Sequence, residues 1–234
     1  MVDFETTQWS MVQAAECDST ARAEEALGQL CQKYWPPLYV YARRRVQNEA
    51  DAMDLVQAFF TQLLEKHYLA DADQNRGRFR SFLITAFKHF MAKEWAKSKA
   101  QKRGGNHKIL AMDVASGDSI IAFDPQSGAS PEQLYERQWA RSLLDLVMQR
   151  LESEYTQQRK QRFFSLLKEF ISSETDAKYA DVSEELAMNE SAVRMAASRL
   201  RKRYRELLRD EIAHTVSNAD EVDSEIGHLF KVFQ

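Results

Sequence analysis

Apolar residues recur every three or four positions along most of this chain, and this spacing restricts the fold more than any other feature. The spacing is typical of amphipathic helices, whereas no convincing apolar–polar alternation of a strand appears. The 234 residues include only 7 Gly and 4 Pro, the two residue types that interrupt helices. The sequence therefore predicts an all-α protein.

The first half of the chain is expected to hold three helices, at about 20–45, 49–66 and 79–102. Pro36 and Pro37 should kink or split the first one, because proline removes a backbone donor and clashes with the preceding turn. The residues expected to face inward are Leu27, Leu30, Tyr34, Leu38 and Tyr41 in the first helix, Met53, Val56, Phe60, Leu63 and Leu64 in the second, and Phe79, Phe82, Leu83, Ala86 and Phe90 in the third.

A linker is expected in the middle of the chain, because four of the seven glycines and two of the four prolines fall between Gly104 and Pro131. We therefore predict two small helical domains, 1–103 and 131–234, joined by a linker at 104–130. Ser130 and Gln133 can form a capping box, with Pro131 in the first helical position. Helices at 131–155 and about 158–172 should follow, and an acidic amphipathic segment at 219–233 closes the chain, where we expect it to pack.

Residues 179–208 contain a short and a longer helical pattern, separated by a break at 187–189. Asn189 is a suitable N-cap for the second helix. This layout predicts a helix-turn-helix. The residues spaced to form its small core are Val182, Leu186, Val193, Ala197 and Leu200.

In a DNA-binding motif of this kind, the second helix places its N-terminal half in the major groove. The outward residues expected to meet base edges are Ser191, Arg194, Met195, Ser198, Arg199 and Lys202. Those better placed for phosphates, where charge is sufficient, are Arg201, Arg203, Arg205 and Arg209. The alternative is an ordinary helical hairpin with a solvated basic face.

The net charge of −3 hides two basic islands. Residues 76–103 hold nine Lys/Arg and one Glu, and residues 194–209 hold seven Lys/Arg and one Glu. These two segments carry +14, so the other 190 residues must sum to −17. Two such islands on an acidic body suggest a polyanionic partner that is met at two places.

The first basic island alternates its cations with the rings of Phe79, Phe82, Phe87, Phe90 and Trp95. Most of these rings are expected in the core, since a stripe of aromatic residues on a helix is usually buried. An exposed ring beside cations can stack on an unpaired base, which suits single-stranded nucleic acid. The two islands together indicate a protein that binds duplex DNA at one end and an opened strand at the other.

The segments YWPPLYVYARRRV, EADAMDLVQAFFTQLLEKHYL and RGRFRSFLITAFKHFMAKEW, in this order, resemble a bacterial RNA polymerase sigma factor of the extracytoplasmic-function (ECF) type. The resemblance covers about 21–102, as the core-binding and promoter-melting region 2, and 134–209, as the region 4 that reads the upstream element. It implies a function in promoter recognition, strand opening and transcription initiation. The partners it implies are the clamp and flap of core RNA polymerase and promoter DNA, as duplex and as melted strand. An anti-sigma protein is a further candidate partner.

By this resemblance, the residues that face core polymerase are Asp51, Asp54, Leu55 and Gln57. The candidates for the downstream element and for strand melting are Arg78, Arg80, Phe82, Lys88, His89 and Phe90. The polar residues of the second helix lie opposite its apolar stripe, which agrees with a binding face there. The cost of unstacking bases must be offset by ring stacking and phosphate contacts.

Other function classes find less support in the sequence. Cys17 and Cys31 have no metal-ligand spacing and are expected to be reduced thiols of a cytoplasmic protein, and no segment is long and apolar enough to span a membrane. No catalytic constellation or cofactor-binding loop stands out, so an enzyme is not expected. Two Glu-x-x-His pairs, at 211–214 and 225–228, leave a di-iron carboxylate bundle as a weak alternative. The main alternative is a helix-turn-helix transcriptional regulator that acts without core polymerase.

Overall fold

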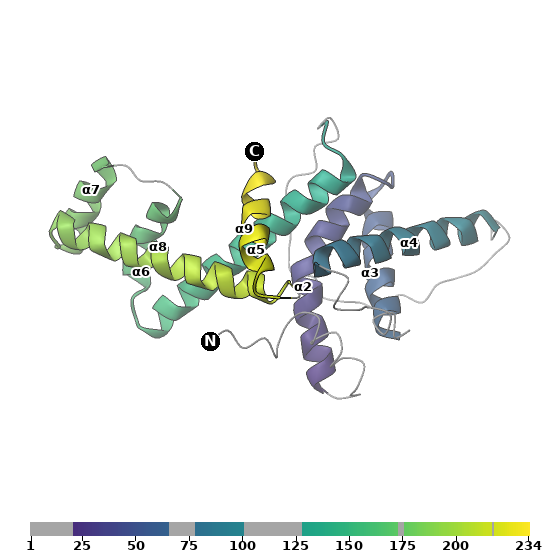
Figure 1. Cartoon of the computed structure of the whole chain (residues 1–234), viewed down its shortest axis with the longest axis horizontal. Helices are drawn as coiled ribbons and strands as arrows, with labels where there is room; N and C mark the ends of the chain where they lie inside the picture. The colour runs from purple at the N-terminus through teal and green to yellow at the C-terminus, as the bar shows by residue number, and fades with distance from the viewer. Residues whose placement is uncertain (1–20, 66–77, 101–127, 173–175, 217) are drawn as a thin grey trace. The chain divides into compact units, whose positions relative to one another are not determined.

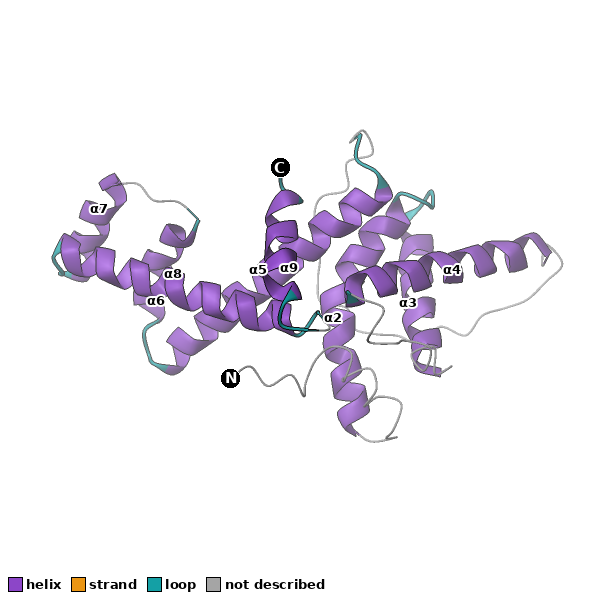
Figure 2. Ribbon diagram, viewed as in Figure 1, coloured by secondary structure: helices purple, strands orange, loops and turns teal. Residues whose placement is uncertain are grey.

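The computed structural model describes residues 21–65, 78–100, 128–172, 176–216 and 218–234. Throughout these ranges the chain forms helices joined by turns and loops, without a strand, which confirms the predicted all-α class (Figure 2). The elements, labelled in Figure 1 where there is room, are α2 (Ala21–Arg43), α3 (Glu49–Glu65), α4 (Phe79–Ala100), α5 (Pro131–Gln157), α6 (Gln161–Leu167), the 3-10 helix η4 (Lys168–Ile171), α7 (Asp176–Leu186), α8 (Glu190–Ala213) and α9 (Glu221–Lys231).

The chain divides into two compact units, and their boundaries differ from those that the sequence predicts. Unit 1 comprises Met1–Ser142 together with Ile212–Gln234, and unit 2 comprises Leu143–Glu211. The first turns of α5 and the whole of α9 therefore belong with the N-terminal half of the chain. The predicted N-terminal segment 1–20, Cys17 and most of the predicted linker lie outside the described residues.

In unit 1, α2 remains one helix through Pro36 and Pro37. The predicted stripe is buried where its side chains are described, at Tyr34, Leu38 and Tyr41. Apolar packing on both sides of the proline pair holds the helix together there, although two backbone donors are missing. The side chains of the other predicted stripe residues, Leu27 and Leu30, lie outside the described part.

Helix α3 begins one residue after Asn48, whose side-chain oxygen accepts the backbone N–H of Asp51 at 2.7 Å and acts as an N-cap. Val56, Phe60 and Leu63 are buried as expected, and the side chain of Leu64 is outside the described part. Met53 was expected to face inward but is 43% exposed, so this prediction was wrong. Phe59 is buried on this helix instead.

Helix α4 buries a stripe that is rotated from the predicted one. Its inward residues include Phe79, Leu83, Phe87 and Phe90. Phe82 and Ala86, expected on the stripe, are half-buried. The ring of Phe87 lies 5.0 Å from that of Phe59 on α3, in an edge-to-face arrangement that stabilises the contact between the two helices.

Helix α5 begins with the predicted capping box. The backbone N–H of Gln133 donates to Oγ of Ser130 at 3.1 Å, and the backbone N–H of Ser130 donates to Oε1 of Gln133 at 2.8 Å. Pro131 is its first helical residue, where proline's missing N–H would have no partner within the helix anyway. The start of this helix could be located from three residues, Ser130, Pro131 and Gln133, within four positions of the sequence.

Unit 2 contains the rest of α5 with α6, η4, α7 and most of α8. The break between α5 and α6 is formed by Arg159, which has a left-handed φ of 59°. The rings of Phe170 and Tyr179 stack with centroids 4.3 Å apart and join η4 to α7. The other large buried residues of the unit include Val147, Leu151, Phe164, Leu167, Val193, Leu200 and Leu207.

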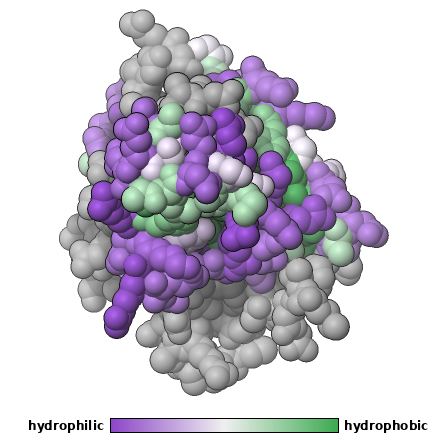
Figure 3. Space-filling view, turned by 90° about the vertical axis from the view of Figure 1, so that its left-hand side faces the viewer, coloured by the Kyte–Doolittle hydropathy of each residue, from purple (hydrophilic) through white to green (hydrophobic). Residues whose placement is uncertain are grey.

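On the face shown in Figure 3, hydrophilic side chains cover most of the described surface, and a smaller hydrophobic area lies among them. Within the described ranges, no helix has both the length and the apolar character needed to cross a membrane.

Candidate functional site

In unit 2, helices α7 and α8 are separated by Ala187, Met188 and Asn189, the three residues of the predicted break. Helix α7 ends in a Schellman arrangement, because the N–H of Met188 donates to the carbonyl of Ser183 at 3.0 Å. Ala187 takes the left-handed position of this turn, with φ 51°. Asn189 caps α8, and its Oδ1 accepts the backbone N–H of Ala192 at 2.7 Å, which confirms the predicted N-cap.

The N-terminal half of α8 buries one face and exposes another. Val193, Ala197 and Leu200 are buried. The exposed residues are those predicted to read DNA bases: Ser191, Arg194, Met195, Ser198, Arg199 and Lys202. Met195, at 55%, is among the most exposed large apolar residues of the described part. A row of hydroxyl and cationic side chains therefore faces solvent beside the turn.

Arg194 is oriented by its neighbours within unit 2. Its guanidinium carbon lies 4.3 Å from the centre of the Tyr179 ring, and one of its nitrogens lies 3.8 Å from Oε2 of Glu190. The cation–ring contact holds the guanidinium group of Arg194 against α7. The ion pair is exposed, so it contributes little energy and can open when a stronger anion approaches.

The cations predicted to bind phosphates differ in exposure. Arg205 is exposed and Arg201 is half-buried. Arg203 is bound to Glu154 of α5, with N–O distances of 2.9 and 2.6 Å, and to Glu206 at 3.2 Å. The hydrogen bond from Arg203 lowers the pKa of Glu154, and the bond to Glu154 raises the pKa of Arg203. Arg203 thus holds α8 to α5 in this conformation.

In unit 1, Arg80 at the start of α4 is 3% exposed. Its Nε donates to Glu225 of α9 at 2.6 Å, and its Nη1 donates to Glu136 of α5 at 2.5 Å. Burial alone would lower the pKa of Arg80, but the hydrogen bond to Glu225 and the charges of both carboxylates outweigh it and raise the pKa. The guanidinium also lies over the ring of Trp139, 4.7 Å from its centre. In this conformation Arg80 is not accessible to DNA, and its role there stays a prediction.

Two more of the predicted melting residues are cations engaged by acids from outside α4. Nε of Arg78 lies 2.8 Å from Glu225, and Nη2 donates to Oγ of Ser224 at 3.1 Å. Nζ of Lys88 lies 2.8 Å from Glu132, and this hydrogen bond lowers the pKa of that carboxyl.

The aromatic members of the predicted melting set are partly in the core. Phe90 is 7% exposed, and its ring lies 5.6 Å from that of Phe59, so in this conformation it packs rather than stacks on a base. Phe82 is half-buried, and His89 is exposed. Among the Phe and Trp rings of the described part of α4, Trp95 is the most exposed, at 40%. Trp95 is absent from the predicted site residues, although it lies in the same basic, aromatic island.

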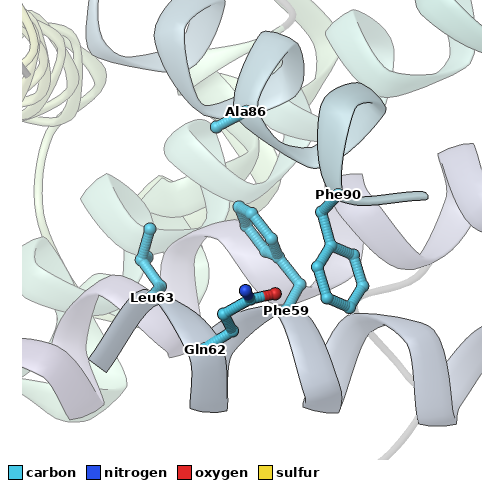
Figure 4. A pocket seen from close by; sticks show the side chains of 5 residues that line it. All are labelled: Phe59, Gln62, Leu63, Ala86 and Phe90. Atoms are coloured by element: carbon cyan, nitrogen blue, oxygen red, sulfur yellow. The ribbon is translucent and has the colours of Figure 1, made fainter. Parts of the chain in front are cut away.

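A small apolar hollow lies between α3 and α4 (Figure 4). It is lined by Phe59, Gln62, Leu63, Ala86 and Phe90. Its volume of about 10 Å³ is close to that of one water molecule. The hollow is too small for a nucleobase in this conformation.

The residues predicted to face core polymerase lie along α3. Asp51 and Asp54 are exposed, and Leu55 and Gln57 are half-buried. Asp51 also accepts a hydrogen bond from Nδ2 of Asn48 at 2.8 Å. The exposed side chain of Met53, a residue type that is enriched in interaction faces, adds an apolar contact surface among these carboxylates.

The two Glu-x-x-His pairs are engaged with cations or carboxylates rather than with each other. Glu211 pairs with Arg150, and Glu225 pairs with Arg78 and Arg80. Nε2 of His228 lies 3.1 Å from Oε2 of Glu136. Among the described residues, no group of three or more His, Cys, Asp or Glu is arranged to hold a metal ion. Cys31 is buried as a free thiol, and burial raises its pKa to about 12.

Comparison with known proteins identifies part of the chain. Residues 30–101 match the Sigma-70 region 2 family, and this range contains α3, α4 and the second half of α2. No curated protein and no solved structure matches the chain. The match supports a sigma-70 superfamily factor with a role in transcription initiation, which is not an enzymatic role. Region 2 of such factors binds core RNA polymerase and downstream promoter DNA.

Proposed function

We propose that this chain, which contains a sigma-70 region 2 domain, is an ECF-like sigma factor that directs promoter recognition and strand opening by RNA polymerase. The observation that carries the proposal is the region 2 match over residues 30–101. The exposed basic face of α8 supports a second DNA contact. A sigma factor needs two DNA contacts, because it must locate a promoter duplex and then hold one of its strands open.

Helix α3 is the proposed polymerase-binding element. Asp54 and Met53 project from it into solvent, and Leu55 and Gln57 lie at the edge of that face. A mixed acidic and apolar surface suits a basic, partly apolar partner, because charge steers the encounter and apolar burial supplies affinity. The clamp of core polymerase is the partner that the family implies for this helix.

Helix α8 is the proposed reader of the upstream duplex element. Ser191, Arg194, Ser198 and Arg199 are exposed at its N-terminal half, just behind the turn. Arginine binds guanine with two hydrogen bonds in the major groove, and serine adapts to several base edges. Arg201 and Arg205 are the proposed phosphate contacts, and the flap of core polymerase is the second proposed protein partner.

Helix α4 is the proposed holder of the opened strand. His89 and Trp95 are exposed on it, and Lys88 is paired with Glu132 at a partly exposed position. Cations beside a ring can bind phosphates and stack on a base together. Arg78 and Arg80 join this surface once their carboxylate partners move. We place the activity in the cytoplasm, where the polymerase acts, and an anti-sigma protein remains a proposed regulator.

The test is transcription of genomic fragments by core polymerase with and without this protein. We expect discrete run-off transcripts only when the protein is added. A transcriptional regulator without polymerase binding gives no such transcripts, and that result together with failure to co-purify with core would overturn the proposal.

A paired variant tests the α3 assignment in the same assay. Asp54→Ala with Gln57→Ala should weaken core binding and reduce transcript yield while the helical circular dichroism stays unchanged. Glu152→Ala with Gln157→Ala is the matched control, because it removes one acid and one amide from an exposed part of α5. Equal co-purification of both double variants with core would contradict this role of α3.

A further inference from the structure

Three cations, Arg78 just before α4 and Arg80 and Lys88 within it, are bound by three carboxylates that come from two other segments of unit 1. Arg78 and Arg80 contact Glu225 at 2.8 and 2.6 Å, Arg80 also contacts Glu136 at 2.5 Å, and Lys88 contacts Glu132 at 2.8 Å. Glu132 and Glu136 lie in the first turns of α5, and Glu225 lies in α9. These cations are half of the six residues predicted to bind the downstream element.

Carboxylates in these positions offer the same chemistry as DNA phosphates. Arginine binds either group through two parallel N–H···O hydrogen bonds, and Arg80 binds Glu225 in this way, through Nε at 2.6 Å and Nη2 at 3.2 Å. A phosphate therefore competes for the same donors. The strand and the carboxylates cannot occupy them together.

We infer that the segment 212–234, with the first turns of α5, is a built-in competitor that covers the strand-binding cations of α4 until promoter DNA displaces it. The inference rests on the proposed role of α4 in holding the opened strand. The segment lies against α4 through more than its charges. The backbone N–H of Phe79 donates to the carbonyl of Thr215 at 3.3 Å, and Val222 and Leu229 are buried on the same stripe of α9 as Glu225.

The ion pairs differ in burial, and this difference gives an order of release. The side chains of Lys88 and Glu132 are 39% and 43% exposed, so this pair is screened by solvent and opens readily. Arg78 is 29% exposed, whereas Glu225 is fully buried. Arg80 and Glu225 are both buried, so their separation requires α9 to move. DNA should therefore capture Lys88 first and Arg80 last.

The chemistry of the covered site favours competition over a purely structural role. A buried ion pair is a weak source of stability, because desolvation of both charges cancels most of their attraction. Apolar side chains of similar volume would hold α9 to α4 at least as well. Carboxylate partners differ from apolar ones in that a polyanion can replace them at the cations of α4.

The experiment measures binding of the full-length protein, in complex with core polymerase, to a forked promoter DNA with an unpaired downstream strand. Glu132→Gln should tighten binding about twofold, and Glu225→Gln about tenfold. The plot of log affinity against log salt concentration should also become steeper, by up to about 0.7 per freed cation. In the wild-type protein each displaced glutamate takes up a counterion when the strand binds, and in the glutamine variants this uptake is absent. Amide exchange of α9 should accelerate when the wild-type complex binds the fork.

Glu152→Gln is the matched control, since it removes one exposed carboxylate from α5 in unit 2. If wild-type protein opens promoters but both test variants bind the fork no better than this control, the competitor role is wrong and α9 is a fixed support. If wild-type protein does not act with core polymerase at all, the proposed function itself fails. Should Glu225→Gln not fold, Glu132→Gln and the exchange of α9 still decide between competitor and support.

Discussion

The two basic islands of this chain have similar charge in the sequence, but their cations differ in the structure: those at α4 are paired with acids of other segments, and those at the start of α8 are exposed. At α4, Arg80, Lys88 and the preceding Arg78 are bound by acids from α5 and α9. On the N-terminal half of α8, Arg194 and Arg199 are exposed, and the acid beside Arg194 comes from its own helix. The number of cations in a segment therefore does not determine how many of them are accessible to a partner.

The difference follows from what covers each helix. The start of α4 lies inside unit 1, where two segments that are distant in sequence close over it. The start of α8 uses only one face for the core of unit 2, through Val193, Ala197 and Leu200. A helix that is covered on several faces must neutralise its cations locally, whereas a helix with one buried face leaves them to solvent.

The largest expected effect breaks the pairing on α4. Arg80→Ala removes the shared partner of Glu225 and Glu136 and leaves the buried carboxylate of Glu225 with Arg78 alone, so we expect a loss of up to about 3–5 kcal/mol of unfolding free energy. Urea unfolding followed by circular dichroism measures this loss. Arg199→Ala on α8 is the control, with an expected change within about 0.5 kcal/mol. A loss below about 1 kcal/mol for Arg80→Ala would show that the buried pairs are not important for stability.

The next largest effect is expected on α8, where a substitution should change DNA binding rather than stability. Arg199→Ala should weaken binding to the cognate upstream duplex by about 1–3 kcal/mol if this side chain reads a base. Arg205→Ala should instead weaken binding to the cognate and the scrambled duplex equally, since phosphates carry no sequence information. Competition titrations with cognate and scrambled duplexes separate the two. Equal losses on both duplexes for Arg199→Ala would remove its base-reading role.

A smaller effect concerns the turn that positions α8. Ala187 has φ 51°, a conformation that disfavours residues with a Cβ. Ala187→Gly should therefore stabilise the protein by about 1 kcal/mol. Ala180→Gly, at an exposed position within α7, is the matched control and should destabilise by about 1 kcal/mol. Thermal unfolding of the two variants should show shifts of opposite sign, and shifts of the same sign would contradict the strained turn.

The smallest effect concerns Arg203, the α8 cation that resembles those of α4. Its hydrogen bond lowers the pKa of Glu154, so the pair stabilises the folded state above the unfolded pKa of about 4.3 and loses this contribution as pH falls through the lower folded value. Both side chains are partly exposed, so we expect less than about 1 kcal/mol. The stability difference between wild type and Glu154→Gln should shrink between about pH 7 and about pH 3. A difference that does not change with pH would rule out this pair as the cause.

Local features of the fold could be predicted from the sequence because they depend on residues close together in the chain. The capping box at Ser130 and the cap at Asn189 involve side chains within three residues of their partners, and the break at 187–189 is closed by backbone hydrogen bonds to Ser183 and Glu184. The buried face of α8 was also predicted, since a period of 3.6 specifies it directly. Recognition of region 2 likewise used several consecutive segments in order.

Features that depend on distant residues could not be predicted. Arg80 lies 56 residues from Glu136 and 145 from Glu225, and no local pattern relates them. The same limit explains the rotated stripe of α4 and the exposure of Met53, because which neighbouring helix lies against a face decides what is buried there. The carboxylates of α5 and α9 are the functional candidates that sequence analysis missed, and only Glu225 was marked at all, through its Glu-x-x-His context.

The discontinuity of unit 1 has a consequence for the order in which the protein forms on the ribosome. Unit 2 is complete once residue 211 has been translated, but unit 1 also requires residues 212–234. At about 5–20 residues per second, Arg80 emerges roughly 7–30 s before Glu225, the later of the two glutamates that bind it. During this interval the nascent chain lacks the α9 part of the cover over Arg78 and Arg80, and nearby nucleic acid, including ribosomal RNA, can compete for their guanidinium groups.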